Sequence, residues 1–251
     1  MPLLVVRSAA EAKAHILDHA PDLCFVNGWY WLFDHETLNA ASGGFVGVHN
    51  SLLPAYRGAA PLVWALINGE KEVGSSIFYM GDGMDEGDVL KQVRVTVGPD
   101  DRIGDVLERL EEGVLAELPS VWKALLDGSA VATPQAHHQA SYCGPRQPSD
   151  GLINWCLPAY AVHNFIRAQS DPYPGAFTVL DGRTISILEA HPIDVRYAGT
   201  PGQVLRLNGA VVLVSCGENT ALAVRTVRVD GTSMPAAKVL KSIRIRLLSH
   251  H

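Results

Sequence analysis

The chain has 251 residues, of which 47% are hydrophobic and 18% charged, and its net charge is −6. This composition is typical of a globular protein and excludes an intrinsically disordered chain. The acidic balance argues against non-specific nucleic-acid binding as the main activity, and the apolar runs are shorter than the roughly 20 residues that a membrane helix requires.

The cysteines and the N-terminus indicate a cellular compartment. The four cysteines stand far apart and form no C-x-x-C pair: Cys24, Cys143, Cys156 and Cys216. The N-terminus lacks the basic region and apolar core of a secretory signal. We therefore expect a reduced, cytoplasmic protein.

The first half of the chain alternates strands and helices. An apolar run over residues 1–6 is compatible with a strand, and Ser8 and Glu11 form a capping box for a helix that Pro21 ends. Further strands are expected over residues 23–26, 45–48, 75–80 and 89–97, and helices over residues 61–68 and 103–126. This alternation predicts an α/β domain with a parallel sheet over residues 1–128.

The second half has a different pattern and charge. Residues 129–150 lack periodicity and carry prolines, which predicts a linker. A helix over 158–169 and short strands over 176–180, 184–190, 202–207, 210–214 and 221–229 predict a small β-barrel domain over residues 151–251. The net charge is −9 over residues 1–149 and +3 over residues 150–251, which also favours two domains.

Two loops carry residues suited to catalysis. His49 ends the strand over 45–48 and opens a polar loop that runs to Gly58, and Asp85 lies in the glycine-rich acidic loop 81–88. If both loops follow strands of one parallel sheet, they open at the same edge. A carboxylate beside an imidazole there would orient the imidazole and favour its charged form. Such a pair could polarise a carbonyl, stabilise an oxyanion and carry the proton that an attacking amine loses.

Each of these features also has a plain structural interpretation. A lone histidine is more often a packed or surface residue than a catalyst, and the acidic loop could be a solvated turn. The acidic loop lacks the alternating oxygen ligands and terminal glutamate of a calcium loop. His137 and His138 form an isolated pair, so no metal site is expected.

Four ordered motifs resemble one family. His49-x-Ser-Leu-Leu-Pro-x-x-Arg-Gly58, followed by Met84-Asp85-x-Gly-Asp88, resembles the formyltransferases that use N10-formyltetrahydrofolate, among them methionyl-tRNA and sugar N-formyltransferases. Arg146-x-Pro-x-Asp-Gly151 and Pro172-x-Pro-Gly-Ala-Phe177 resemble the junction and second domain of the same proteins. The resemblance covers nearly the whole chain. It implies a Rossmann-like formyltransferase domain with a truncated parallel sheet and an OB-like C-terminal β-barrel.

The resemblance also implies roles for individual residues. His49 would stabilise the tetrahedral intermediate, Asp85 would assist proton transfer, and Asn50 is a further catalytic candidate. The residues expected to bind the folate are Asn27, Gly28, Trp29, Tyr30, Trp31, Asp82, Gly83 and Met84. Those expected to face the acceptor are Ser51, Leu53, Tyr56 and Arg57. Aromatic residues at a strand end are usually core, however, and Arg57 could equally serve a structural salt bridge.

The chain departs from the family pattern in two places. The family usually has a catalytic asparagine two residues before the histidine, where this chain has Gly47. Asn50 would point to the opposite face from position 47, unless the strand has ended at His49. The family also begins with an earlier strand, loop and helices, so we expect an unpaired sheet edge that self-association or a further chain would cover.

Three functions are compatible with these observations. The leading hypothesis is formyl transfer to the primary amine of a small molecule, such as an amino sugar nucleotide or an amino acid. Methionyl-tRNA is the second candidate acceptor, for which a charge of +3 on the second part gives weak support. From another class, Gly47 and the short N-terminus motivate a catalytically impaired folate-binding or assembly module.

Overall fold

The computed structural model describes residues 4–29 and 31–248 and contains two compact units. The first unit comprises the chain up to residue 61 with residues 72–96 and 108–145. The second comprises residues 62–71, residues 97–107 and the chain from residue 146 onward. No helix in the described residues is both long enough and apolar enough to cross a membrane.

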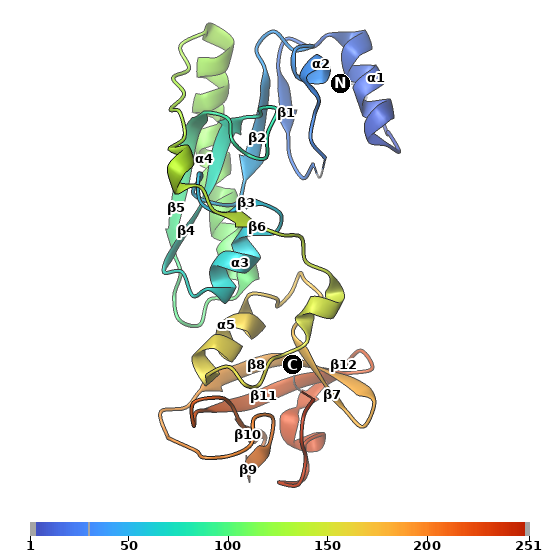
Figure 1. Cartoon of the computed structure of the whole chain (residues 1–251), viewed down its shortest axis with the longest axis vertical. Coiled ribbons are helices and arrows are strands. Elements are labelled where there is room, and N and C mark those ends of the chain that lie inside the picture. Colours follow the sequence, from blue (N-terminus) through green and yellow to red (C-terminus); the bar gives the residue numbers. More distant parts are fainter. Residues whose placement is uncertain (1–3, 30, 249–251) are drawn as a thin grey trace. The chain divides into compact units, whose positions relative to one another are not determined.

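The first unit contains a four-stranded mixed sheet in the order β1-β2-β4-β5 (Figure 1). Its strands are β1 (Cys24–Val26), β2 (Phe45–His49), β4 (Glu72–Tyr79) and β5 (Val89–Thr96). β1 pairs in parallel with β2, whereas β4 is antiparallel to both β2 and β5, so the prediction of a parallel sheet is wrong for β4 and β5. The loop between β4 and β5 is too short for the crossover that parallel strands need, and the connection through α3 (Pro61–Ile67) returns the chain at the His49 end of β2.

Alternation along β2 separates its side chains onto two faces. Val46 and Val48 pack with Ile77 against α4 (Ile103–Asp127). Phe45 lies on the opposite face, in a cluster that also contains Phe33 and residues of α1 (Ala9–His19) and α2 (His35–Leu38). Because side chains two residues apart share a face, His49 follows Phe45 and Gly47 and points away from α4.

The N-terminal helix begins where the sequence predicts. The Ser8 side chain accepts a hydrogen bond from the Glu11 N–H at 3.2 Å and caps α1. Residues 4–6 of the apolar run are not in a strand, and residues 1–3 lie outside the described residues.

The predicted linker contains short elements of its own. Residues up to 145 belong to the first unit. They include the 3-10 turn η1 (His137–Gln139) and β6 (Tyr142–Cys143), which pairs in parallel with β3 (Arg57–Gly58). This pairing attaches the segment to the end of the His49 loop.

The second unit packs one helix on a six-stranded sheet. Its elements are η2 (Pro148–Gly151), α5 (Ala159–Arg167), β7 (Phe177–Leu180), β8 (Arg183–Pro192), β9 (Val204–Asn208), β10 (Val211–Ser215), β11 (Ala221–Val229), β12 (Thr232–Pro235) and η3 (Ala236–Lys238). A large apolar cluster lies between α5 and the sheet, with Trp155 fully buried in it. The indole N–H of Trp155 donates to the Thr178 hydroxyl at 3.2 Å, which satisfies its one buried polar group.

This sheet does not close into a barrel. The pairing runs β7-β8-β11-β10-β9, with β12 on β11, and β7 and β9 are not paired with each other in the described residues. The C-terminal segment takes the free edges instead: Val204 N–H donates to the Ile245 carbonyl at 3.1 Å, and Leu248 N–H donates to the Val179 carbonyl at 3.0 Å. The predicted OB-like barrel is therefore not confirmed.

Candidate active site

His49 lies at the carboxyl end of β2, beside the loop that leaves β1. The parallel register places Val26 opposite Gly47, so residues 27–29 leave the sheet next to Val48 and His49. The first predicted folate-binding loop and the predicted catalytic histidine thus share one edge of the sheet, as expected for neighbouring parallel strands.

The His49 ring is held on both sides. Its Nε2 is 2.8 Å from the Tyr56 carbonyl oxygen, and its Nδ1 is 3.6 Å from Asp85 Oδ2. The His49 side chain is 11% exposed and the Asp85 side chain 20% exposed. Because Nε2 faces an acceptor, a neutral ring carries its proton there and presents the Nδ1 lone pair toward Asp85.

Asp85 reaches His49 by a route that differs from the predicted one. β4 runs antiparallel to β2 and ends opposite the start of β2, so the two loops do not leave the sheet at the same edge. Loop 81–88 instead returns over the face that carries His49. Asp85 has φ +49°, and its Oδ2 accepts the Gly58 N–H at 2.8 Å. A left-handed backbone and a fixed carboxylate are features of a preorganised site.

A buried arginine and glutamine support the Asp85 loop. The Gln135 side-chain NH₂ donates to the carbonyls of Asp85 at 2.9 Å and Gly87 at 2.6 Å. Gln135 Oε1 accepts hydrogen bonds from Arg57 Nε at 3.1 Å and Nη2 at 2.7 Å. Arg57 is 1% exposed and also contacts His137 Nδ1 and the Tyr142 hydroxyl. Gln135, His137 and Tyr142 belong to the same unit as Arg57, and through Gln135 the arginine fixes the backbone that carries Asp85.

Gln135 and Cys143 also belong to this region, although no sequence motif marks either residue. Cys143 Sγ lies 3.3 Å from the Arg57 carbonyl oxygen. Burial and, to a lesser extent, the nearby Asp85 carboxylate raise the pKa of the Cys143 thiol to about 11. Both residues come from the predicted linker, whose sequence gives no periodic signal, and their partners lie about 50 to 90 positions away.

The loop after His49 is held by its own polar side chains. The Ser51 hydroxyl, which is buried, donates to the Ala55 carbonyl at 2.7 Å, and the buried Leu53 donates its N–H to the Ser76 hydroxyl at 3.1 Å. Tyr56 has φ +57° and supplies the carbonyl that orients His49. These contacts fix the loop conformation; they do not themselves identify an acceptor.

The structure shows what surrounds Gly47, which stands where the family has an asparagine, and what Asn50 contacts. β2 ends at His49, and Asn50 Oδ1 accepts the Ser75 hydroxyl at 2.8 Å. A Cβ atom at Gly47 would lie 3.2 Å from Phe78 Cε1 and 3.3 Å from Met80 Cγ. The space beside position 47 is therefore occupied by Phe78 and Met80.

The aromatic loop is partly core and partly exposed. The Trp29 ring stacks on Phe33 with centroids 4.9 Å apart, and its edge meets Trp31 at 5.0 Å. Trp31 is 56% exposed. Trp29 Nε1 is buried without a hydrogen-bond partner in the described residues. Asn27 and Gly28 are exposed, and Tyr30 lies outside the described residues.

The remaining predicted folate contacts lie in the acidic loop. Asp82 Oδ2 is 3.4 Å from Nδ1 of His35 in α2, so this side chain extends toward the N-terminal helices. Met84 is 47% exposed, and a Cβ atom at Gly58 would lie 3.1 Å from its sulfur. At Gly83 a side chain would collide with Glu86. Asp85 and Met84 thus approach the His49 loop, and Asp82 does not.

A cavity of about 420 Å³ lies in the second unit and is not lined by His49 or Asp85. The Arg146 guanidinium stands 4.8 Å from the Trp64 ring centroid and 5.6 Å from that of Phe165. Burial lowers the pKa of Arg146 from its ordinary value, and its Nη2 donates to the Asp150 carbonyl and Gln169 Oε1. The arginine of the junction motif therefore has a structural role within this unit.

Comparison with known families agrees with this geometry. Residues 6–121 match the family described as formyl transferase, and residues 146–244 match the formyl transferase C-terminal domain. The chain belongs to the formyl transferase family. A relative with a known name is the methionyl-tRNA formyltransferase of Anaeromyxobacter dehalogenans strain 2CP-1. It is 37% identical to this chain over 234 residues, which cover 91% of this chain and 75% of the relative.

Solved structures share the fold at lower identity. HypX from Aquifex aeolicus in complex with tetrahydrofolic acid has a TM-score of 0.67 and 21% identity, with 91% of this chain covering 40% of HypX. The sugar 3N-formyl transferase WlaRD, solved with dTDP and 5-N-formyl-THF, has a TM-score of 0.64 and 16% identity, with 83% of this chain covering 72% of it. This formyl transferase family member thus spans about two fifths of the HypX chain.

Proposed function

We propose that the chain transfers a formyl group from N10-formyltetrahydrofolate to a primary amine, with His49 and Asp85 as its catalytic residues. The observation that carries the proposal is the His49–Asp85 contact at 3.6 Å, beside the loop that follows β1. Membership of the formyl transferase family and folate-bound structures of the same fold support the choice of donor.

The two side chains suit the two needs of this reaction. The amine forms a bond to the formyl carbon, the bond from that carbon to N10 breaks, and a proton moves from the amine to N10. Asp85 is the group that accepts the proton and returns it, because its carboxylate is fixed by the Gly58 N–H. His49, when it carries a proton on Nδ1 as well as on Nε2, is the group that donates a hydrogen bond from Nδ1 to the oxyanion of the tetrahedral intermediate.

The absence of an asparagine at position 47 gives His49 a larger share of this stabilisation. Phe78 and Met80 fill the space beside Gly47, and the Asn50 amide oxygen is bonded to Ser75. Asn50 contributes to the site by fixing the end of β2 against β4. An oxyanion-hole donor is worth on the order of 10²–10³ in rate, so removal of His49 has a correspondingly large effect.

The folate is assigned to the loop after β1 and the tip of loop 81–88. The exposed face of Trp31 suits a flat heterocycle, and the buried Trp29 Nε1 offers a donor. Asn27, Gly28, Trp29 and Trp31 bind from one side, and Gly83 and Met84 from the other. For Asp82, whose side chain extends toward α2, and for Tyr30, which lies outside the described residues, folate contact is expected from the sequence alone.

Two acceptors remain candidates because different observations favour them. Curated relatives that are 33–37% identical to this chain are methionyl-tRNA formyltransferases, which favours methionyl-tRNA. A net charge of −6 favours a small amine, such as an amino sugar nucleotide. Ser51, Leu53, Tyr56 and Arg57 shape the loop on the acceptor side, with Arg57 acting through Gln135.

The test measures release of tetrahydrofolate by the full chain from N10-formyltetrahydrofolate, with methionyl-tRNA or an amino sugar nucleotide as acceptor. Transfer to either one that His49→Ala abolishes supports the proposal. The matched control is His19→Ala, which removes an exposed histidine of α1. Folate binding by calorimetry without donor hydrolysis or transfer would favour the non-catalytic module instead. With methionyl-tRNA, turnover should fall steeply as salt rises, whereas turnover of a small amine should not.

A further inference from the structure

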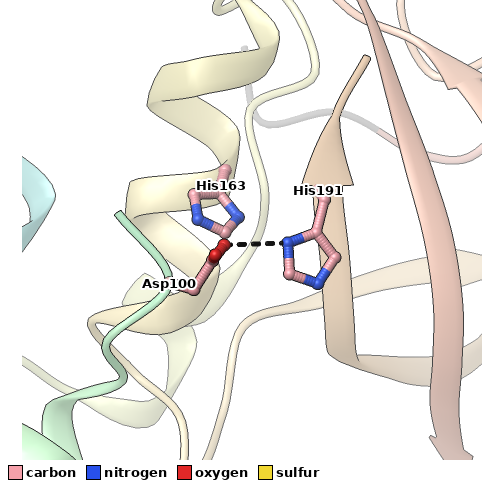
Figure 2. A group of neighbouring side chains, drawn as sticks. All are labelled: Asp100, His163 and His191. Atoms are coloured by element: carbon pink, nitrogen blue, oxygen red, sulfur yellow. Dashed lines mark hydrogen bonds and ion pairs between the residues drawn. The ribbon is translucent and has the colours of Figure 1, made fainter. Parts of the chain in front are cut away.

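Three side chains from distant parts of the sequence meet in the second unit. Asp100 lies in the turn before α4, His163 on α5 and His191 on β8, and Figure 2 shows the three side chains facing one another. Each offers one ligand atom, and these atoms all lie within 4.8 Å of one another. All three residues belong to the second unit, whereas the proposed catalytic residues His49 and Asp85 belong to the first.

The contacts of His163 indicate a cation at its ring. Nδ1 is 2.7 Å from the Ala190 carbonyl oxygen, and Nε2 is 3.0 Å from the Pro99 carbonyl oxygen. A neutral imidazole has one N–H, so it donates to only one of the two oxygens and turns a lone pair toward the other. His163 is 9% exposed, which limits the relief that solvent can give. A positive charge between Nε2 and the Pro99 oxygen removes the repulsion.

The separations of the donor atoms fit a metal ion. His191 Nδ1 is 3.1 Å from Asp100 Oδ1, close to the 3.0 Å between His163 Nε2 and the Pro99 oxygen. With bonds of about 2.1 Å, neighbouring ligands of a metal ion stand about 3.4 Å apart in tetrahedral and about 3.0 Å apart in octahedral coordination, so small shifts of these atoms fit either geometry. Glu189 Oε1 lies 3.8 Å from His191 Nε2 and adds negative charge. The Asp100 and His191 side chains are 73% and 38% exposed, so water can complete the coordination.

The surrounding bonds hold these donors in place before any ion binds. Arg167 Nη1 on α5 donates to the Gly98 carbonyl at 2.9 Å and the Asp101 carbonyl at 3.1 Å. The Gly98 N–H donates to Asp101 Oδ2 at 2.7 Å and tightens the same turn. The bond from His163 Nδ1–H to Ala190 leaves the Nε2 lone pair for a ligand, the arrangement common for metal-binding histidines.

We propose that Asp100, His163 and His191, with the Pro99 carbonyl oxygen, bind a divalent transition-metal ion, Zn²⁺ first among them. Two imidazoles with a carboxylate form a ligand set that suits Zn²⁺. The ion joins the turn at residues 98–101 to α5 and β8 and so stabilises the second unit. The sequence carries no motif for this site because its ligands are dozens of residues apart.

The test is calorimetric titration of the full chain with Zn²⁺. Wild type should bind Zn²⁺, and Asp100→Asn and His191→Ala should each lower the affinity at least about tenfold. Loss of a residue that only hydrogen-bonds to a metal ligand already lowers affinity by about that factor, so loss of the ligand itself should lower it at least as much. Both side chains are partly exposed, so these variants should fold. His138→Ala, which removes an exposed histidine outside the group, is the matched control and should titrate like wild type.

A second readout follows the ring of His163 directly. In long-range ¹H–¹⁵N spectra, Zn²⁺ should shift the Nε2 signal of His163 in wild type and leave it unshifted in His191→Ala. The melting temperature of wild type should also rise with the logarithm of the Zn²⁺ concentration. Identical titrations of wild type and His191→Ala would overturn the proposal. So would a His163 ring that is protonated at both nitrogens and does not respond to Zn²⁺.

Discussion

Two of the histidine–aspartate pairs in the described residues, His49–Asp85 and His191–Asp100, have different surroundings. In the first unit, His49 Nδ1 lies 3.6 Å from Asp85 Oδ2, and both side chains are largely buried. In the second, His191 Nδ1 lies 3.1 Å from Asp100 Oδ1, and both are more exposed. The Asp85 carboxylate is held by the Gly58 N–H, whereas carbonyl oxygens face the ring of His163 beside the second pair.

The groups that surround a histidine–aspartate pair decide its chemistry. Where a backbone N–H fixes the carboxylate and the pair ends a strand beside a loop, the pair can move a proton and stabilise an oxyanion. Where carbonyl oxygens converge on an imidazole, the site lacks a positive charge and suits a cation. We therefore propose that the same residue types serve catalysis in one unit and metal binding in the other.

The largest expected effect separates the two pairs by activity. His49→Ala and Asp85→Ala should each lower the rate of formyl transfer by about 10²–10⁴, because each removes a group that acts on the reacting atoms. His191→Ala should leave the rate unchanged in buffer without metal. Initial rates of tetrahydrofolate release measure this effect, and circular dichroism checks folding. Equal rates in His49→Ala and His191→Ala would remove the distinction between the pairs.

The next largest effect concerns Gln135, whose side chain holds the backbone of the Asp85 loop. Gln135→Ala should lower the free energy of unfolding by about 1–3 kcal/mol, since it leaves the buried Arg57 guanidinium and two carbonyls without their partner. The rate of transfer should fall with it, because the Asp85 backbone is no longer fixed. Urea unfolding and initial rates give both values. Gln139→Ala, an exposed glutamine of the same segment, is the control, and an equal loss there would contradict the assigned role.

A smaller effect concerns the position without asparagine. Gly47→Asn should destabilise the chain by about 1–3 kcal/mol, because its side chain meets Phe78 and Met80. It should not raise the rate of transfer, since that space is already filled. Thermal unfolding and initial rates are the measurements. At Gly144 a Cβ would meet nothing within 4 Å, so Gly144→Asn is the control. A faster Gly47→Asn enzyme would show that an amide there can still serve.

The smallest expected effect is a difference in the rate at which the cysteine thiols are alkylated. Burial raises the pKa of Cys143 to about 11 and that of Cys216 to about 12, whereas Cys156 is exposed. Because the thiolate is the reactive form, iodoacetamide at pH 8 should modify Cys156 first and reach Cys143 and Cys216 only as the pH approaches their pKa values or the chain unfolds. Peptide mass spectrometry gives the order. Early modification of Cys143 would contradict the raised pKa of this partly buried thiol.

The sequence predicted local structure better than pairing. Apolar periodicity located α4, and the Ser8 cap located α1, since both signals lie within a few residues. Strand direction was missed because it depends on how the connection through α3 returns. β12, over Thr232–Pro235, has few apolar residues and gave no signal.

In the two sites as well, contacts between distant parts of the chain were harder to predict than local features. His49 and Asp85 are close, as the sequence suggested, although by a loop that folds back rather than through a shared edge. The partners of Arg57 and the three metal ligands lie too far apart in sequence to be read as motifs. Tertiary packing alone brings them together.

The most direct measurement is a crystal structure of the chain with 5-formyltetrahydrofolate. The pterin should lie against the loop that contains Trp29 and Trp31, and the formyl group should lie within hydrogen-bond reach of His49 and Asp85. A folate bound elsewhere, or with its formyl group remote from both side chains, would contradict the proposed catalytic site.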